Sequence, residues 1–266
     1  MPRAALFAVL LCLLPAAAWP APLPSVFLEE LTWTEVRDAI KSGKTTLIVP
    51  IGGTEQSGPH IALGKHNARV HFMAGRVAAA LGDALVAPVL AYVPEGSTNP
   101  ATEHMRFPGT ISIPESAFEE ILIATGKSMR HHGFKEIVFI GDHGGYQRAM
   151  KRAAAALNRD WAGGPARAHA IEEYYTAMSS EYAKVLAARG FSEEEIGTHA
   201  GLADTSLTLA IDPSLVRAER LRDSNTREEG VSGDPERSSS DLGKLGVDLV
   251  VKRTTDAIRA ARSAAN

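Results

Sequence analysis

Three separate stretches of the chain carry acidic and imidazole side chains. The first, Glu55–His66, directly follows the β-branched run 45–52. The second is the pair Glu103–His104, and the third is the pair Asp142–His143, which directly follows the apolar run 135–141. Carboxylate and imidazole groups bind Zn, Mn and Fe, and they also serve as acids and bases in hydrolysis.

The pattern of strands and helices explains why these stretches should meet. Apolar runs predict strands at 45–52, 84–93, 135–141 and 166–171. Helical spacing predicts helices at 28–42, 66–81, 114–132, 145–161, 172–189, 201–211 and 241–264. Alternation of this kind is typical of an α/β fold with a mostly parallel sheet and helices on both faces. The carboxyl ends of parallel strands lie at one edge, so we expect the three stretches to converge there.

The ligand chemistry is restricted by the cysteine content. A single histidine in a loop is more often a surface or hydrogen-bonding residue, so the metal prediction depends on several ligand-type residues meeting at one edge. The chain has one cysteine, Cys12, which excludes both a disulfide framework and a thiolate metal site. We therefore expect a divalent ion held by His, Asp and Glu, with Zn favoured and Mn or Fe as alternatives.

The bulk composition is that of an ordinary globular protein. The chain has 266 residues, of which 45% are hydrophobic and 22% charged, and we expect a single domain over 25–266. The formal net charge is −3, and no Lys/Arg block exceeds two adjacent residues. This pattern argues against a nucleic-acid partner.

Residues 1–21 have the pattern of a secretory signal peptide. Arg3 is followed by the apolar run Ala4–Leu14 and by the small residues of Pro15–Ala18, with Ala21 as a second cleavage point. The alternative is an uncleaved membrane anchor, but a run of eleven apolar residues is too short to span a bilayer. We therefore expect a secreted or periplasmic protein without a stable membrane anchor.

Five blocks, in order, carry a resemblance to a known family. They are Pro50–His60, Glu103–Thr110, Ile140–Gly145, His199–Ser206 and Gly230–Pro235. Together they resemble the motifs of the creatininase (creatinine amidohydrolase) family. The resemblance implies a three-layer α/β/α sandwich, a homo-oligomer, and hydrolysis of linear or cyclic amide C–N bonds at a centre of one or two metal ions.

The chain departs from the family motifs at the metal site. Glu55 and His143 match metal-binding positions, whereas Ser57 stands in place of a His, His66 in place of a bridging Asp, and Asp204 in place of a Glu. Imidazole offers one lone pair to a metal, so it rarely bridges two ions. The departures therefore favour a centre with one ion.

The resemblance assigns a role to each candidate residue. The predicted metal ligands are Glu55, His66, His143 and Asp204, with His60 as a spare ligand. The predicted catalytic residues are His199 as proton donor to the leaving amine and Glu103 as base, and the predicted substrate contacts are His104 and Tyr146. The alternative for His199 is a packing or capping role at the start of the helix at 201–211.

We expect an exported metal-dependent hydrolase that acts on an amide, cyclic amide or formamide of a small molecule. Creatinine itself is a poor candidate, because the departures fall inside the metal site. The competing interpretation is a binding or structural protein that kept the fold and lost the chemistry. The departures that favour this alternative are Ser57, His66 and Tyr146, the last of which stands in place of an Asn that flanks the His-Gly-Gly of the family motif.

Overall fold

The structure is a computed structural model that describes residues 23–224 and 226–264. The predicted signal peptide therefore lies outside the described residues. Within the described ranges, every helix is too short or too polar to cross a bilayer.

The central sheet has four parallel strands in the order β2-β1-β3-β4. The strands are β1 (Thr46–Ile51), β2 (Ala84–Val86), β3 (Glu136–Gly141) and β4 (Arg167–Ala170). β1 pairs with β3 along its whole length, from Thr46 opposite Glu136 to Ile51 opposite Gly141. Every residue of β1 is buried, as expected for a strand that is covered on both faces.

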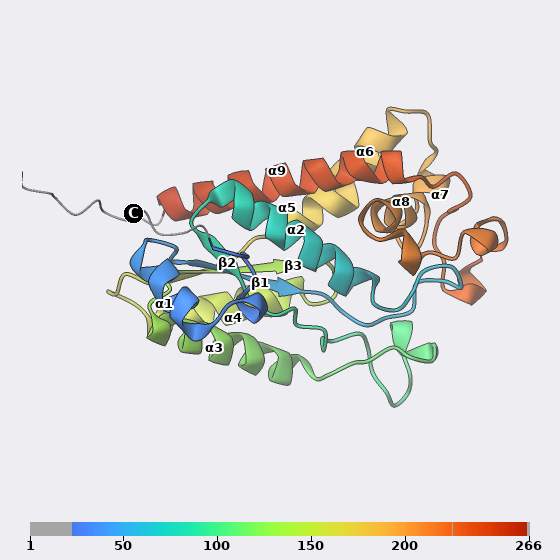
Figure 1. Cartoon of the computed structure of the whole chain (residues 1–266). Coiled ribbons are helices and arrows are strands. Elements are labelled where there is room, and N and C mark those ends of the chain that lie inside the picture. Colours follow the sequence, from blue (N-terminus) through green and yellow to red (C-terminus); the bar gives the residue numbers. More distant parts are fainter. Residues whose placement is uncertain (1–22, 225, 265–266) are drawn as a thin grey trace, which may run out of the picture.

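Helices cover both faces of this sheet (Figure 1). The first face carries α1 (Trp33–Lys41), α3 (Glu115–His132) and α4 (Gln147–Asp160). The second carries α2 (Lys65–Leu81), α5 (Glu173–Thr176), α6 (Tyr182–Ala187), α8 (Leu202–Ile211) and α9 (Ser240–Ala264). Alternate strand residues feed the two cores, with Leu47 and Val49 packing on the first side and Ile48 on the second. The predicted three-layer α/β/α sandwich is confirmed.

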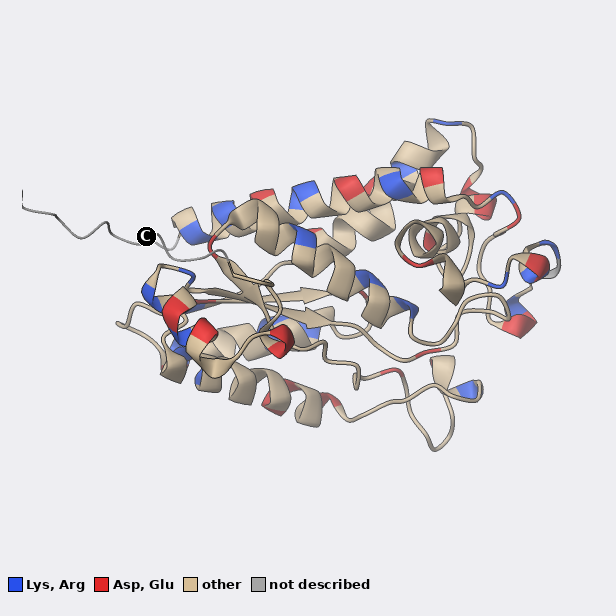
Figure 2. Ribbon diagram, in the orientation of Figure 1, with Lys and Arg blue, Asp and Glu red and all other residues tan. Residues whose placement is uncertain are grey.

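Short elements complete the chain. They are α7 (Glu193–Ile196) and the 3-10 helices Leu28–Glu30, Glu103–Arg106, Pro213–Leu215, Ala218–Asp223 and Arg227–Glu229. Charged residues of both signs are spread along α9 (Figure 2). This is the pattern of a solvated helix face and not of a basic patch.

Three predicted elements are wrong in extent. The predicted helix 28–42 is divided into the 3-10 helix Leu28–Glu30 and α1, which begins at Trp33 after its N-cap Thr32. The run 84–93 forms a strand only over Ala84–Val86. Beyond it lies Pro88, which has no N–H for a sheet ladder, and only the isolated bridge of Leu90 with Ile51 continues the pairing. The predicted helix 172–189 is interrupted by the π-helical segment Ala177–Glu181.

Candidate metal centre

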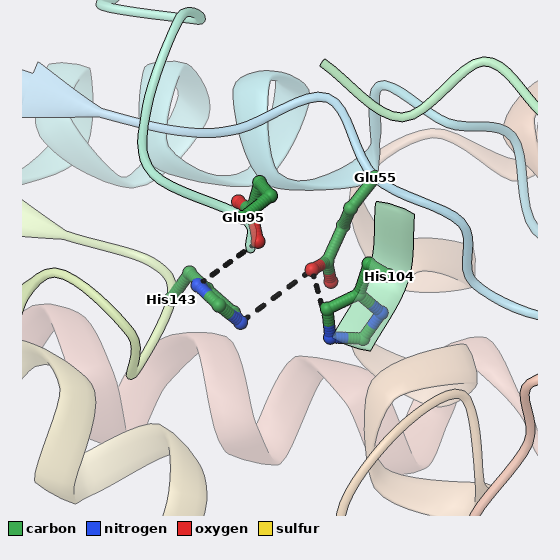
Figure 3. A group of neighbouring side chains, drawn as sticks. All are labelled: Glu55, Glu95, His104 and His143. Carbon is green, nitrogen blue, oxygen red and sulfur yellow. Dashed lines mark ion pairs between the residues drawn. The ribbon is translucent and has the colours of Figure 1, made fainter. Parts of the chain in front are cut away.

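Four side chains converge beyond the carboxyl ends of the strands: Glu55, Glu95, His104 and His143 (Figure 3). Each offers one ligand atom, and these atoms all lie within 4.8 Å of one another. Glu55 follows β1, Glu95 follows β2 and His143 follows β3, while His104 lies in the 3-10 helix Glu103–Arg106. The predicted convergence of separate stretches at one edge is therefore observed.

The distances show a connected group. His104 Nε2 lies 3.3 Å from Glu55 Oε2, and His143 Nε2 lies 3.4 Å from the same oxygen. On its other side, His143 Nδ1 lies 3.4 Å from Glu95 Oε2 (Figure 3). Both carboxylates are buried, whereas the two imidazoles are about one-fifth exposed, at 20% and 19%. Solvent can therefore reach the group from the imidazole side.

The group contains buried oxygens without hydrogen-bond donors. Among the described residues, Glu55 Oε2 and both carboxylate oxygens of Glu95 have no partner. Burying a carboxylate oxygen without a donor is costly, and a bound cation would remove that cost. Two carboxylates and two imidazoles also suit Zn, Mn or Fe. The residues present therefore fit a divalent metal ion.

A glycine provides the space for one of these carboxylates. Gly53 has a φ of 153°, and a Cβ there would lie 2.7 Å from Glu95 Oε1. Such a side chain would clash with the Glu95 carboxylate and would strain the backbone. Glycine at this position therefore allows Glu95 to reach the group.

Three of the four groups are in the protonation state that binds a metal, and Glu95 would have to lose a proton to bind one. Burial lowers the pKa of His143 to about 4 and also lowers the pKa of His104, so both imidazoles are neutral at pH 7. Burial would raise the pKa of Glu55, but the charges of His66 and Lys65 hold it well below the usual range. Burial and the nearby Glu55 carboxylate raise the pKa of Glu95 to about 10. Neutral imidazoles and an ionised carboxylate are the forms that bind metals.

Two predicted ligands, His66 and Asp204, lie outside the group. His66 directs Nε2 at Glu55 Oε1, 2.6 Å away, and Nδ1 at an oxygen of Asp142. These contacts, at 2.6 and 2.5 Å, are hydrogen bonds that engage both nitrogens of His66, whereas the nitrogens of His143 lie 3.4 Å from the nearest carboxylate oxygens. Asp204 accepts hydrogen bonds from Lys65 and Arg69 at 2.8 and 2.7 Å. The group that can hold an ion therefore contains Glu95 and His104 in place of His66 and Asp204.

Tyr146 is placed where it cannot contact a substrate. It is fully buried, its hydroxyl donates to the carbonyl oxygens of Ile51 and Gly52 at 2.8 Å, and the hydroxyl accepts from the backbone N–H of His143 at 3.0 Å. This geometry corrects the predicted role, because Tyr146 positions the backbone of His143. His104, the other predicted substrate contact, belongs to the metal-ligand group.

His199 lies beside the group with its ring centroid 4.6 Å from that of His104. Its Nε2 lies 3.0 Å from the carbonyl oxygen of Gln56, so Nε2 carries the proton and donates. The Nδ1 atom lies 3.7 Å from Glu55 Oε1. Burial lowers the pKa of His199 to about 3, so the ring is neutral at pH 7. A proton donor to a leaving amine must first carry the extra proton, so this low pKa argues against the predicted role of His199.

The remaining predicted residues, Glu103 and His60, lie outside the metal-ligand group. Glu103 is exposed, and its backbone is in the left-handed region with a φ of 46°. His60 is buried and donates from Nε2 to the carbonyl oxygen of Ala200 at 3.0 Å, so it is not part of the ligand group. Ala200 is also left-handed, with a φ of 55°. Such conformations in residues other than glycine occur mostly where the surrounding structure enforces them, often at functional sites.

Two cavities reach the group from different sides and share His104, His143 and Tyr175. The smaller has a volume of about 270 Å³ and is lined by Asp204 and Thr198 together with apolar side chains such as Met178, Ile196 and Leu207. The larger has a volume of about 700 Å³, and the carboxyl side chains of Glu95, Glu103 and Glu115 line it. The shared histidines therefore face two separate spaces.

Sequence reasoning missed Glu95 as a ligand. It lies at the exit of the second predicted strand, the same signal that identified Glu55 and Asp142–His143. Ligand-type residues that follow the other strands predict the site. A search for such residues after the run 84–93 identifies Glu95 as a further candidate.

Comparison with known proteins gives consistent matches. The family model described as creatinine amidohydrolase, Creatininase, matches residues 29–258. The chain is 32% identical over 185 residues to the mycofactocin precursor peptide peptidase of Mycolicibacterium smegmatis, and this match covers 68% of the chain and 63% of that relative. It is 27% identical over 259 residues to the creatinine amidohydrolase of Pseudomonas putida, covering 88% of the chain and 96% of that relative.

The fold comparison agrees with the sequence comparison. A solved structure described as a Mn creatininase superposes with a TM-score of 0.75 at 25% identity, covering 89% of this chain and 98% of the solved chain. The predictions of the family, of its α/β fold and of a hydrolase are confirmed by these matches. The chain belongs to the creatininase family of hydrolases.

Proposed function

We propose that the chain is an exported hydrolase that cleaves a non-peptide amide C–N bond in a small molecule with the help of one divalent metal ion. Glu55, Glu95, His104 and His143 would hold the ion. The observation that carries the proposal is the convergence of Glu55, Glu95, His104 and His143, whose ligand atoms all lie within 4.8 Å of one another, together with three buried carboxyl oxygens that have no hydrogen-bond partner among the described residues.

When bound, a divalent ion would supply a water of lowered pKa and would polarise a carbonyl group. The protein's own residues prepare the site for this chemistry. His66 and Lys65 keep Glu55 ionised, and Tyr146 fixes the backbone at His143. His199 keeps its proton on Nε2 through the Gln56 carbonyl, so its neutral ring presents Nδ1 to the site as a hydrogen-bond acceptor.

The size of the cavities supports a small substrate. An amide bond at His104 and His143 would place one substituent in the space of about 270 Å³ and the other in the space of about 700 Å³. The smaller space lies below the usual volume range of pockets for drug-sized ligands. Amides, cyclic amides and formamides with one compact substituent fit this restriction.

A short peptide is the second candidate substrate. The relative from Mycolicibacterium smegmatis is described as a peptidase that acts on a precursor peptide. The larger cavity is lined by several carboxyl groups, so it would favour a basic or neutral residue. Peptides therefore belong in the same substrate panel as the small amides.

The proposal also covers the metal, the location and the assembly. Zn is our first expectation because the ligands are imidazole and carboxylate, with Mn and Fe as alternatives. The pattern of residues 1–21 supports export, and a homo-oligomer is what the resemblance to the family motifs implies. Amino-terminal sequencing of the protein recovered outside the cytoplasm would test the cleavage point, and light scattering would give the mass in solution.

The central experiment combines metal analysis with a substrate panel. The protein is purified from metal-replete medium, its metal content is measured by plasma emission spectroscopy, and linear amides, cyclic amides, formamides and short peptides are assayed before and after chelation. About one equivalent of metal and chelator-sensitive hydrolysis of a small amide would support the proposal. Metal without hydrolysis of any substrate would favour the degenerate binding protein, and absence of metal would overturn the metal site.

A further inference from the structure

A second cluster of ligand-type residues lies directly beside the metal-ligand group. It consists of His66, Asp142 and Asp204 together with the Oε1 atom of Glu55, and the three residues line the smaller cavity. By residue type alone, three carboxylates and an imidazole would form a metal site. The structure shows what occupies these ligands instead.

Two buried cations neutralise the carboxylates of this cluster. Lys65 Nζ lies 2.8 Å from Asp204 Oδ2 and 3.7 Å from Glu55 Oε1. Arg69 donates from Nε to Asp142 Oδ1 at 2.9 Å and from Nη1 to Asp204 Oδ1 at 2.7 Å. The side chains of Lys65 and Arg69 are 0% and 1% exposed, so water screens these charges little.

The oxygens of the cluster all have partners. Glu55 Oε1 contacts His66 Nε2 at 2.6 Å, and Asp142 Oδ2 accepts from the hydroxyl of Tyr174 at 2.7 Å. Asp204 Oδ2 also accepts from the backbone N–H of Ala200 at 2.8 Å. This complete satisfaction contrasts with the three orphan oxygens of the neighbouring group.

The position of the cations in the fold supports a specific role. Lys65 and Arg69 stand four residues apart in the first turns of α2, so they lie on the same face of the helix. The amino end of a helix disfavours cations, and α2 has no acidic residue in its first turn. Local helix preference therefore does not explain why two cations are buried at this end of α2. Their burial is explained by their carboxylate partners, which come from three other parts of the chain.

We propose that Lys65 and Arg69 act as built-in cations that occupy the carboxylates next to the metal centre and limit that centre to one ion. A second divalent ion in this place would have to displace Lys65 from Asp204 and would meet the repulsion of two buried positive charges. The inference depends on the proposed function, because it assumes the first ion at Glu55, Glu95, His104 and His143.

The test is the number of ions bound, measured by isothermal titration calorimetry with excess Zn or Mn and by emission spectroscopy after gel filtration. The wild-type protein should saturate at one ion. Lys65→Met removes one cation and frees the positions that Lys65 Nζ occupies beside Asp204 Oδ2 and Glu55 Oε1, while the contacts of these oxygens with Ala200 N–H and His66 Nε2 remain, so the stoichiometry should rise from one towards two. The matched double variant Lys65→Met/Asp204→Asn removes the opposing charge as well and should remain at one ion.

Circular dichroism and thermal unfolding show whether each variant is folded. A second equivalent in the wild-type protein would overturn the inference without any variant, and so would a folded Lys65→Met protein that binds only one ion. If Lys65→Met does not fold, the wild-type titration with saturating metal decides the question. A wild-type protein that binds no ion would instead overturn the proposed function, so the two failures are distinguishable.

Discussion

Two buried clusters of charged side chains share Glu55 but differ in how their oxygens are satisfied. In the ion-paired cluster, built on Lys65 and Arg69, the carboxylates accept from arginine, lysine, histidine, tyrosine and backbone donors. In the metal-ligand group, both oxygens of Glu95 and one of Glu55 have no donor among the described residues. The first cluster can exist without a ligand, whereas the second is incomplete without a cation.

The difference teaches that residue type alone does not identify a metal site. Asp204 and His66 are good ligands by type, yet cations and carboxylates from the protein already use their ligand atoms. Glu95 and His104 have the same ligand types, but their contacts within the group are longer, at 3.4 Å from Glu95 Oε2 to His143 Nδ1 and 3.3 Å from His104 Nε2 to Glu55 Oε2. The mutations below test this contrast, beginning with the largest expected effect.

Removing His143 should have the largest effect. His143→Ala removes an imidazole that lies between Glu55 and Glu95, so the ion should be lost and hydrolysis with it. The loss of affinity should exceed the roughly 10–100-fold loss typical of outer-shell changes. Metal content by emission spectroscopy measures the effect. His169→Ala is the matched control because His169 contacts Glu136 on the sheet, and it should keep the ion. Full metal content in His143→Ala would refute the ligand group.

Asp142→Asn should have the largest effect on stability. Asp142 is fully buried and accepts from Arg69, His66 and Tyr174, so the change deprives a buried guanidinium of one of its two carboxylates and leaves only Asp204. Breaking a buried ion pair in this way costs about 3–5 kcal/mol. Urea denaturation of the metal-free protein measures the free energy of unfolding. Asp248→Asn, which breaks an exposed pair with Arg76, is the control and should cost at most about 1 kcal/mol. Equal losses in the two variants would contradict the structural role of the ion-paired cluster.

Tyr146→Phe should have a smaller effect, and it distinguishes a positioning role from a substrate contact. Loss of the hydroxyl leaves the backbone N–H of His143 and the carbonyl oxygens of Ile51 and Gly52 without this partner. An unsatisfied buried polar group costs about 1–3 kcal/mol. Denaturation should therefore show reduced stability, while KM for any substrate found in the panel stays within about twofold. A large rise in KM with unchanged stability would restore the predicted substrate contact.

The fold could be predicted from the sequence because it depends on patterns that are local. The β-branched run at 45–52 and the apolar run at 135–141 became β1 and β3, and the spacing of apolar residues located α2 and α9 to within one residue at each end. The strand predicted at 84–93 is too long. The apolar pattern continues to residue 93, whereas the strand itself ends at Val86, two residues before Pro88. Because the strands of a parallel sheet end at the same edge, the predicted sheet also showed where the candidate residues meet.

The ligand set could not be predicted in full because it depends on contacts between distant residues. His66 and Asp204 were chosen by type and by resemblance. The sequence does not show that Lys65 and Arg69, on the next turns of the same helix as His66, approach Asp204 and Asp142. The low pKa of His199 likewise depends on burial, which only the assembled fold reveals.

The smallest effect concerns a single proton, and it tests whether Glu95 is a ligand. Burial and the Glu55 carboxylate raise the pKa of Glu95 to about 10, so this carboxyl holds a proton at pH 7 when no ion is bound. A metal binds the carboxylate form, so binding at pH 7 should release that proton. Calorimetry in buffers of different ionisation enthalpy counts the protons released.

Glu95→Gln keeps the shape but has no proton to lose, so the variant should bind more weakly and release about one proton fewer than the wild type. Because any proton lost from a metal-bound water is common to both proteins, only the difference reports on Glu95. Equal proton counts would place Glu95 outside the ligand set.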